Sequence, residues 1–357
     1  MLKPLENRVE IKFDNQRFGF WQKVSIQQSV DDLCASVSLS LTSQGAGNSL
    51  GFTANTVAQV LINNVLVSTV RADAVKRSVT DNSHSISFNA RSLGRELVDC
   101  QYSKTLSGIK LGEIVKQLCA TFKVPVKILG DTAIVPHFAM QCEQPANALL
   151  NAARAANMLL YALPDGGLML TTPSNAAPVS TLVSGQLIKT YEITDEYKLR
   201  FSEYCIKSFD HAANNSRKGA VKDAGLTYFR PMHIVADRHG QGLGGLQRRA
   251  ELERNRRLAR AHSINLELFG WGYVTEAGKF EPWRINTQVR VVIPEENIDG
   301  VFLIGDCSYE QDDQGGTVSH LSVMHRNAFV GEDKPSKKHS AAHNRKTKKG
   351  QQMSTKQ

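Results

Sequence analysis

Residues 286–293 show the clearest alternation of apolar and polar positions in the chain. Val289, Val291 and Ile293 recur at every second position, and Gln288 and Arg290 point the other way. This pattern is typical of an antiparallel strand with one buried and one solvated face. We expect this strand to be central to a β-rich region at residues 263–330.

The same pattern occurs near the N-terminus. An aromatic residue, an Asn-Thr pair and three inward aliphatics have identical spacing in two sets: Phe52, Ala58, Val60 and Ile62, and Trp283, Val289, Val291 and Ile293. Residues 64–67 then resemble 300–303, and 85–88 resemble 320–323. Two alternating strands always look alike, but three matches in the same order predict an internal repeat. Residues 56–62 should superimpose on 287–293, with Gln59 and Arg290 facing outward.

The remaining patterns divide the chain into further regions. Residues 1–92 read as consecutive strands, with turns at Asn63-Asn64 and residues 45–48. Residues 93–178 change to helical spacing, with a helix after Ser107-Gly108, a helix after Pro145 and a hairpin over 159–172, and predict an α+β insert. Residues 179–262 contain strands within 185–210, an exposed polar loop at 211–227 and a third helix. The predicted fold is α+β and mainly β, with two similar small antiparallel β-barrels separated by the insert, the first at 1–92 and the second at 263–330 with strands from 185–210.

The third helix, at residues 246–261, carries six arginines. Arg254 and Arg257 interrupt its apolar stripe, as in helices that pack against a partner surface. A solvated helix with Glu251 and Glu253 as local partners explains the pattern equally well. Arg254, Arg257 and Trp271 are therefore candidate interface residues. Trp271 and Trp283 also flank the turn at residues 276–279, which favours cross-strand packing.

Composition limits the class of protein. The chain has 357 residues, 41% hydrophobic and 22% charged, which is ordinary for a globular protein of two or three domains. No segment is apolar enough to span a bilayer or to act as a signal peptide, so we expect synthesis in the cytoplasm and no membrane insertion. Six scattered cysteines lack metal-binding or disulfide spacing: Cys34, Cys100, Cys119, Cys142, Cys205 and Cys307.

The net charge of +9 is concentrated at the C-terminus. Residues 334–357 contain eight Lys and Arg residues and no acid, which leaves the rest of the chain near neutral. A segment with so little to bury is predicted to be disordered, from about residue 331 onward. It could contact phosphates or acidic surfaces without specificity, or act only as a solubilising tail.

Candidate catalytic chemistry is sparse. Gly240, Gly242 and Gly245 form a G-x-G-x-x-G motif before a helix, with Glu267 downstream, but residues 233–236 offer too short an apolar strand for a dinucleotide-binding unit. Asp306, Glu310, Asp312 and Asp313 form an acidic turn whose spacing fits no EF-hand. We therefore expect no catalytic residues, no metal site and no cofactor.

Several short motifs resemble a known family. Gly270-Trp271-Gly272, residues 278–283, 286–293 and 300–304, and Gly315-Gly316-Thr317 are similar to the C-terminal barrel of baseplate hub subunits from Mu-like contractile-tailed phages and prophages. That family is related to late-control tail proteins and to the N-terminal part of type VI secretion spikes. The resemblance covers residues 5–330.

The resemblance implies a structural protein of the virion tail baseplate. It implies a homotrimer with a pseudo-six-fold ring and a central passage, which joins a six-fold tail tube to a three-fold spike. The implied partners are the tail tube protein, the central spike protein and the baseplate wedge proteins, with DNA only in transit. Alternatives are a type VI secretion-like spike component, a nucleotide-binding enzyme that uses the Gly240–Gly245 loop, and a basic nucleic-acid binder.

Overall fold

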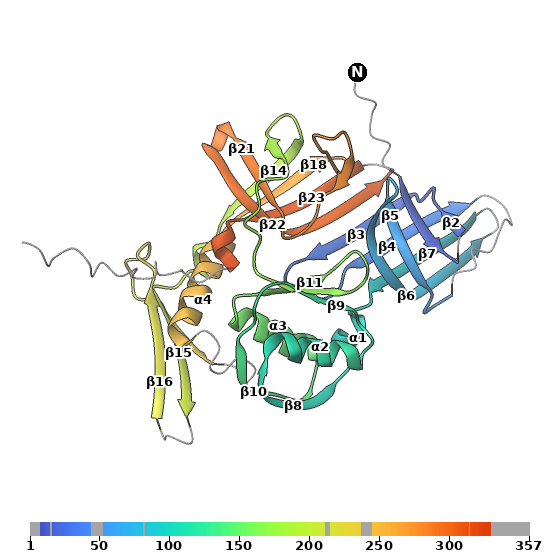
Figure 1. The fold of residues 1–357 in the computed structure, drawn as a ribbon. Coiled ribbons are helices and arrows are strands. Elements are labelled where there is room, and N and C mark those ends of the chain that lie inside the picture. Colours follow the sequence, from blue (N-terminus) through green and yellow to red (C-terminus); the bar gives the residue numbers. More distant parts are fainter. Residues whose placement is uncertain are drawn as a thin grey trace, which may run out of the picture.

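The computed structural model describes residues 8–14, 16–43, 53–80, 83–210, 215–236, 245–313 and 315–329. These residues form a mainly β protein with three parts (Figure 1). A large sheet lies above an α+β insert, and an arm made of one helix and three strands projects to one side. Phe52, the turn at 45–48 and the basic tail lie outside the described residues.

The large sheet is 13-stranded. Its strands from the N-terminal region are β1 (Val9–Phe13), β2 (Gln16–Phe18), β3 (Lys23–Ser29), β4 (Ser36–Ser43), β5 (Val57–Ile62), β6 (Val65–Thr80) and β7 (Ser83–Ser92). Its later strands are β13 (Thr181–Val183), β14 (Ile188–Asp195), β18 (His262–Phe269), β21 (Gln288–Ile293), β22 (Ile298–Asp312) and β23 (Gly316–Met324). The order is β14-β18-β23-β22-β3-β4-β7-β6-β5-β1-β2, and β21 joins β13 to β22. Inward aliphatic side chains from both groups form one continuous core.

The two groups of strands repeat one arrangement. The order β1-β5-β6-β7-β4-β3 corresponds to β13-β21-β22-β23-β18-β14. We call the first the N-module (residues 8–92) and the second the C-module (residues 181–195 and 262–324). They differ in one strand direction, since β1 is antiparallel to β5 whereas β13 is parallel to β21.

Backbone landmarks confirm that the repeat is real. Asn55 and Asn286 both have positive φ, 76° and 56°, which asparagine tolerates better than most residues. The amide of Asn55 donates to the carbonyl of Ala72, and the amide of Asn286 donates to that of Ile304. The amides of Ala72 and Ile304 in turn donate to the carbonyls of Thr56 and Thr287. The Asn-Thr pairs found in the sequence therefore start equivalent strands.

The other two sequence matches were placed in the wrong register. Because Ala72 is equivalent to Ile304, residues 300–303 correspond to 68–71 and not to 64–67. Likewise β7 and β23 align Ala90 with Val323, two residues from the predicted match. Both predicted registers are shifted by an even number of residues, so the assignment of side chains to the inward and outward faces remains correct. Alternation alone cannot detect such a shift.

The prediction of two closed barrels is wrong. β3 of the N-module pairs with β22 of the C-module, so one open sheet runs through both modules. Within the described residues, β13 and β14 meet at an isolated bridge between Ser184 and Ile188 and not along a ladder. A strand edge accepts only one partner strand. The edge of β3 that pairs with the C-module therefore cannot also pair within the N-module to close a barrel.

The insert has its own core. It contains α1 (Arg95–Asp99), α2 (Leu111–Thr121), α3 (Pro145–Ala155), β8 (Tyr102–Lys110), β9 (Val126–Ile128), β10 (Ile134–Glu143), β11 (Leu159–Ala162) and β12 (Leu168–Thr171). In Figure 1 the helices lie between the β8–β10 ribbon and the β11-β12-β9 sheet. The hairpin prediction is confirmed, with Leu159 opposite Thr171 and Gly166 at φ 84°. The helix predicted after Ser107-Gly108 is α2, which begins later than predicted, at Leu111, because β8 extends through Lys110.

The arm comprises β15 (Glu203–Asp210), β16 (Asn215–Lys222), β17 (Pro231–Val235) and α4 (Gly245–Ala261). The predicted loop at 211–227 is wrong in part, because residues 215–222 form β16. Most of its residues are polar, but backbone groups of β16 and β15 pair from Glu203–Lys222 to Asp210–Asn215 regardless of side-chain type. None of the helices in the described part of the chain is long and apolar enough to cross a membrane.

Helix α4 approaches β16 so closely that Gly219 has no room for a side chain. A Cβ atom on Gly219 would lie 2.2 Å from the carbonyl carbon of Leu246. We expect Gly219→Ala to displace α4 and to lower the free energy of unfolding by about 1–3 kcal/mol, as overpacking does. Chemical unfolding followed by circular dichroism measures this. Gly19→Ala is the matched control, because its Cβ would meet Val9 O at an ordinary 3.5 Å; equal effects of the two variants would contradict the prediction.

Candidate functional site: the edges of the repeated sheet

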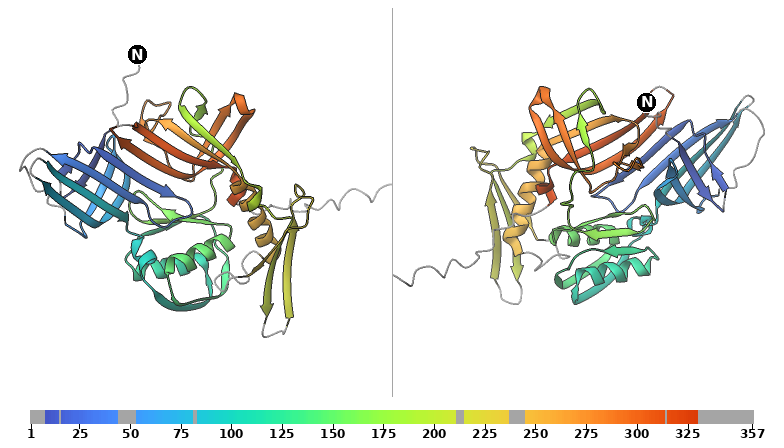
Figure 2. Two further views of the ribbon diagram at one scale, coloured as in Figure 1. Left: turned by 180° about the vertical axis from the view of Figure 1, so that it is seen from behind. Right: turned by 45° about the horizontal axis from the view of Figure 1, so that its top comes forward.

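The junction between β3 and β22 is the feature that links the two modules. Ser29 lies opposite Asp306 and Val24 opposite Gln311, in an antiparallel ladder of six residue pairs. The amide of Val30 extends the contact by donating to the carbonyl of Gly305. Figure 2 shows these strands side by side where the two halves of the sheet meet. The N-module therefore offers the edge of β3, and the C-module offers the second half of β22.

The equivalent edges on the far sides of both modules are open. The second half of β6, residues 74–79, corresponds to residues 306–311 of β22, and β14 corresponds to β3. Within the described chain, β6 residues 74–79 pair with β7 on one side and β14 pairs along its length with β18. No described strand forms a ladder with the other side of either segment. Unpaired edges of this length are templates for pairing with another chain.

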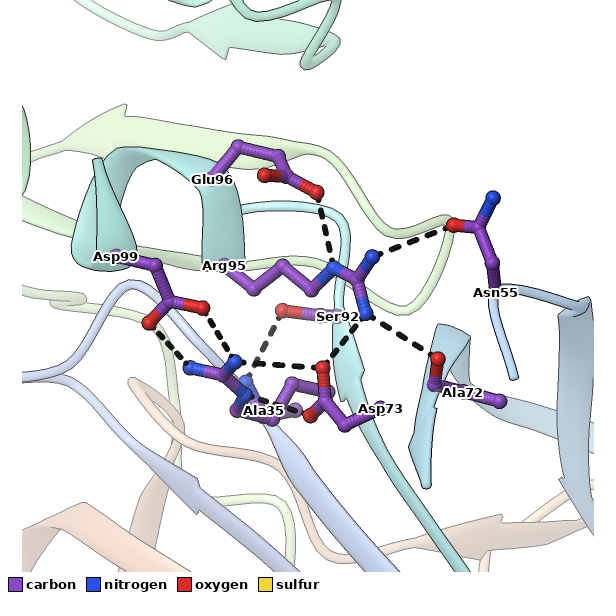
Figure 3. A network of polar contacts seen from close by, with 9 residues as sticks. Ala35, Asn55, Ala72, Asp73, Ser92, Arg95, Glu96 and Asp99 are labelled. Atoms are coloured by element: carbon purple, nitrogen blue, oxygen red, sulfur yellow. Dashed lines mark hydrogen bonds and ion pairs between the residues drawn. The ribbon is translucent and has the colours of Figure 1, made fainter. Parts of the chain in front are cut away.

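A polar network fixes the point where the open part of β6 begins. Asp73 is the bulged residue of β6, and Gly305 is its counterpart in β22. Arg95 Nη1 donates to Asp73 Oδ1 at 2.6 Å (Figure 3). Arg91 Nε donates to Asp73 Oδ2 at 2.7 Å. Arg91 also binds Asp99 of α1, and this hydrogen bond lowers the pKa of Asp99. The network ties the open edge to the insert.

A second charged cluster joins three parts of the molecule. Asp31, in the turn after β3, accepts hydrogen bonds from Arg154 of α3 and from Arg256 and Arg260 of α4, at 3.0, 3.0 and 3.2 Å. Burial raises the pKa of Asp31, but the three guanidinium groups lower it more, and the net shift is downward. The N-module, the insert and the arm thus meet at one carboxylate.

The outward face of the sheet at the module junction is polar. A hollow of about 610 Å³ lies over β3, β14, β18, β22 and β23. Polar side chains that line it include Gln27, Thr190, Glu192, Asn265, Ser308 and Ser322. Because these side chains carry hydroxyl, amide and carboxylate groups, this face of the sheet can be solvated, whereas the opposite face packs on the aliphatic core.

The predicted core residues of the repeat are buried as expected. Ala58, Val60 and Ile62 are at most 1% exposed, and Trp283, Val289, Val291 and Ile293 are too. Gln59 and Arg290 face outward, as predicted. Gln288 does not, because its side-chain amide donates to the carbonyl of Ser174 in a segment that covers it.

The candidate interface residues have different outcomes. Trp271 is 0% exposed, and its Nε1 donates to the carbonyls of Glu310 and Val318, so its assignment to an interface is wrong. It lies across from Trp283 beside the ladder of β19 (Gly272–Val274) and β20 (Phe280–Pro282), which confirms cross-strand packing. Arg257 pairs with Glu253 and lies over the ring of Phe201, and Arg254 donates to Asn255. A partner for these two arginines stays a prediction.

The motifs considered for catalysis are dispersed. Glu267 lies in β18, where it accepts hydrogen bonds from Lys189 and Thr190. The strand before the glycine motif, β17, is five residues long and half exposed. Gly240 and Gly242 lie outside the described residues. Asp306 and Glu310 lie within β22, so the expected acidic turn is a strand there, and no metal-binding cluster occurs among the described residues.

Family models match three parts of this chain. The N-terminal domain of Mu phage baseplate assembly protein GpP-like proteins matches residues 8–92, and the second domain of baseplate hub protein gp44-like proteins matches 95–172. The fourth domain of Mu phage baseplate assembly protein GpP matches 245–332. The baseplate hub protein gp44 of Escherichia phage Mu is 26% identical over 348 residues, which cover 91% of this chain and 90% of that protein.

Solved structures have the same fold. The 43 kDa tail protein of prophage MuSo2 from Shewanella oneidensis superimposes with a TM-score of 0.78 at 23% identity, covering 90% of this chain and 99% of that one. The tail protein from Neisseria meningitidis MC58 gives 0.78 at 19% identity, covering 91% and 99%. The matched domain models are those of Mu-type phage baseplate proteins, and the two solved tail proteins share the fold of this chain. The chain is a homologue of the baseplate hub protein gp44 of phage Mu.

Proposed function

We propose that this chain is the structural hub subunit of a Mu-like phage or prophage tail baseplate, located in the virion and without enzymatic activity. The observation that carries the proposal is the repeat: one chain holds two equivalent modules joined edge to edge through β3 and β22. Each module also has one further edge of the same kind left open. A subunit with this geometry can be added head to tail.

The proposed assembly is a homotrimer with pseudo-six-fold symmetry. If the junction between chains repeats the junction within a chain, each step relates one module to the next by a similar rotation. Six modules from three chains then close a ring. Such a ring offers six similar surfaces to a six-fold tail tube while keeping true three-fold symmetry toward a central spike. Baseplate wedge proteins would contact its outer parts.

The ring leaves a central passage. Eight strands per chain, from β14 to β6, would line it, with neighbouring strands about 4.8 Å apart. Three such sets enclose a space about 40 Å across between opposite backbones, and barrels of far fewer strands already leave a water-filled channel. The polar outward face of these strands suits a wall along which DNA moves in transit.

The mass of the purified protein tests the proposal. Light scattering combined with gel filtration should give about three times the 39.4 kDa of one chain. Two-dimensional class averages from electron microscopy should show a ring with six similar lobes. A protein that stays monomeric at every concentration, or one that forms closed dimers, would refute the hub proposal, because two chains supply four modules and cannot form this ring.

A further inference from the structure

We infer that chains of the ring are joined by a specific β-ladder, in which residues 75–79 of β6 in one copy pair antiparallel with Tyr191–Asp195 of β14 in the next. The inference rests on the proposed hub function and names its partner surface, a second copy of this chain. The edges of β6 and β14 are open, and the equivalent edges of β22 and β3 pair with each other inside the chain.

The register follows from the junction within the chain. There, Ser308 of β22 lies opposite Gln27 of β3. Ser308 corresponds to Lys76, because each lies two residues beyond the residue that follows the bulge, Asp306 in β22 and Ala74 in β6, along equivalent ladders. Gln27 corresponds to Thr194, because β3 with β4 and β14 with β18 form equivalent ladders. Lys76 should therefore lie opposite Thr194 of the next copy.

Burial distinguishes the covered edges from the open ones. At the junction within the chain, Val24, Ile26 and Tyr309 are 3%, 0% and 0% exposed. The residues that correspond to Val24 and Ile26 are Tyr191 and Ile193, which are only half buried. The counterpart of Tyr309 is Arg77, which is exposed, and the counterpart of Gln311 is Val79, which is 76% exposed. Apolar side chains at these edges would lose contact with water when the ladder forms, which favours association.

Charge complementarity supports the same register. Lys76 would lie on the polar face between Glu192 and Glu196 of the next copy, its two diagonal neighbours. Ser78 would lie directly opposite Glu192. The corresponding junction within the chain has no lysine on β22, where the polar face carries Asp306, Ser308 and Glu310 opposite serines and a glutamine. Lys76 on β6, Glu192 on β14 and Glu196 directly after β14 therefore favour pairing between unlike edges and disfavour pairing of β14 with itself.

Cysteine pairs test the register. In a Cys34→Ser, Cys100→Ser, Cys142→Ser background, which removes the three cysteines that are not buried, Lys76→Cys combined with Thr194→Cys should give covalent dimers and closed covalent trimers on a non-reducing gel after mild oxidation. Gln27→Cys with Ser308→Cys is the matched control, because these residues are partners within one chain and should form a disulfide without increasing the mass. Ser78→Cys with Thr194→Cys is offset by two residues and should cross-link markedly less.

The outcomes separate the inference from the hub proposal. A trimer that fails to cross-link through residues 76 and 194, or that cross-links equally through 78 and 194, overturns the inferred ladder and leaves the hub standing. A protein without any trimer overturns both.

A charge reversal gives an independent measurement. Lys76→Glu should weaken trimer formation about ten-fold by replacing two diagonal attractions with repulsions. Adding Glu192→Lys and Glu196→Lys should restore it. Lys222→Glu makes the same change in charge on β16, away from both edges, and should leave the trimer unchanged. Equal weakening by Lys76→Glu and Lys222→Glu, or no rescue, would refute the charge pairing.

Discussion

A Trp271→Ala variant is expected to lose about 3–5 kcal/mol of unfolding free energy, the cost of removing a large buried aromatic side chain. Trp271 is 0% exposed, and its Nε1 bridges the carbonyls of Glu310 on β22 and Val318 on β23 at 3.2 and 3.1 Å. These two residues are partners in the ladder that continues into the β3 junction. The substitution would leave both a cavity and unsatisfied carbonyls.

Denaturant unfolding followed by circular dichroism measures this loss. Trp271→Phe keeps an aromatic ring but no donor, and should cost roughly 1–3 kcal/mol, clearly less than alanine. If Trp271 were instead a contact between subunits, Trp271→Ala would weaken the trimer and leave the unfolding of the single chain unchanged. That result would restore the interface assignment that the structure contradicts.

An Asp31→Asn variant should lose about 2 kcal/mol at neutral pH, because three arginines would then share no carboxylate. The loss is smaller than for a fully buried ion pair, because the side chain of Asp31 is 31% exposed and solvent screens its charge. Without the carboxylate of Asp31, the arm and the insert should detach from the N-module before the large sheet unfolds. Faster limited proteolysis near α4 would show this.

The pH dependence of the same variant follows from the lowered pKa of Asp31. A carboxyl group with a lowered pKa in the folded state stabilises fully above its ordinary value, here 3.8, and loses this effect as the pH falls through the folded value. The stability difference between wild type and Asp31→Asn should thus be constant near neutrality and shrink below about pH 4. Glu276→Gln removes one carboxylate from an exposed turn elsewhere in the chain and serves as the control. A gap that widens on acidification would contradict the assignment.

The sequence by itself determined the local elements and their inward faces. Alternation identified the strands around Val60 and Val291, because side chains on a strand point to opposite faces at every second residue. The Asn-Thr pairs marked both starts of the repeated strand, because Asn55 and Asn286 adopt a positive φ that few residues tolerate. Helical spacing and the glycine turn identified α3 and the β11–β12 hairpin for the same local reason.

Only the tertiary structure decided how these elements combine. The bulges at Asp73 and Gly305 set the register of the repeat, and a shift by two or four residues leaves the alternation unchanged. The ladder between β3 and β22 depends on backbone groups, which are alike in every residue, so no side-chain pattern announces it. Trp271 and Asp31 likewise owe their surroundings to residues far away in the chain, such as Val318 and Arg260. Local periodicity fixes which face of a strand is buried, whereas the choice of neighbour for each edge is made by the folded chain as a whole.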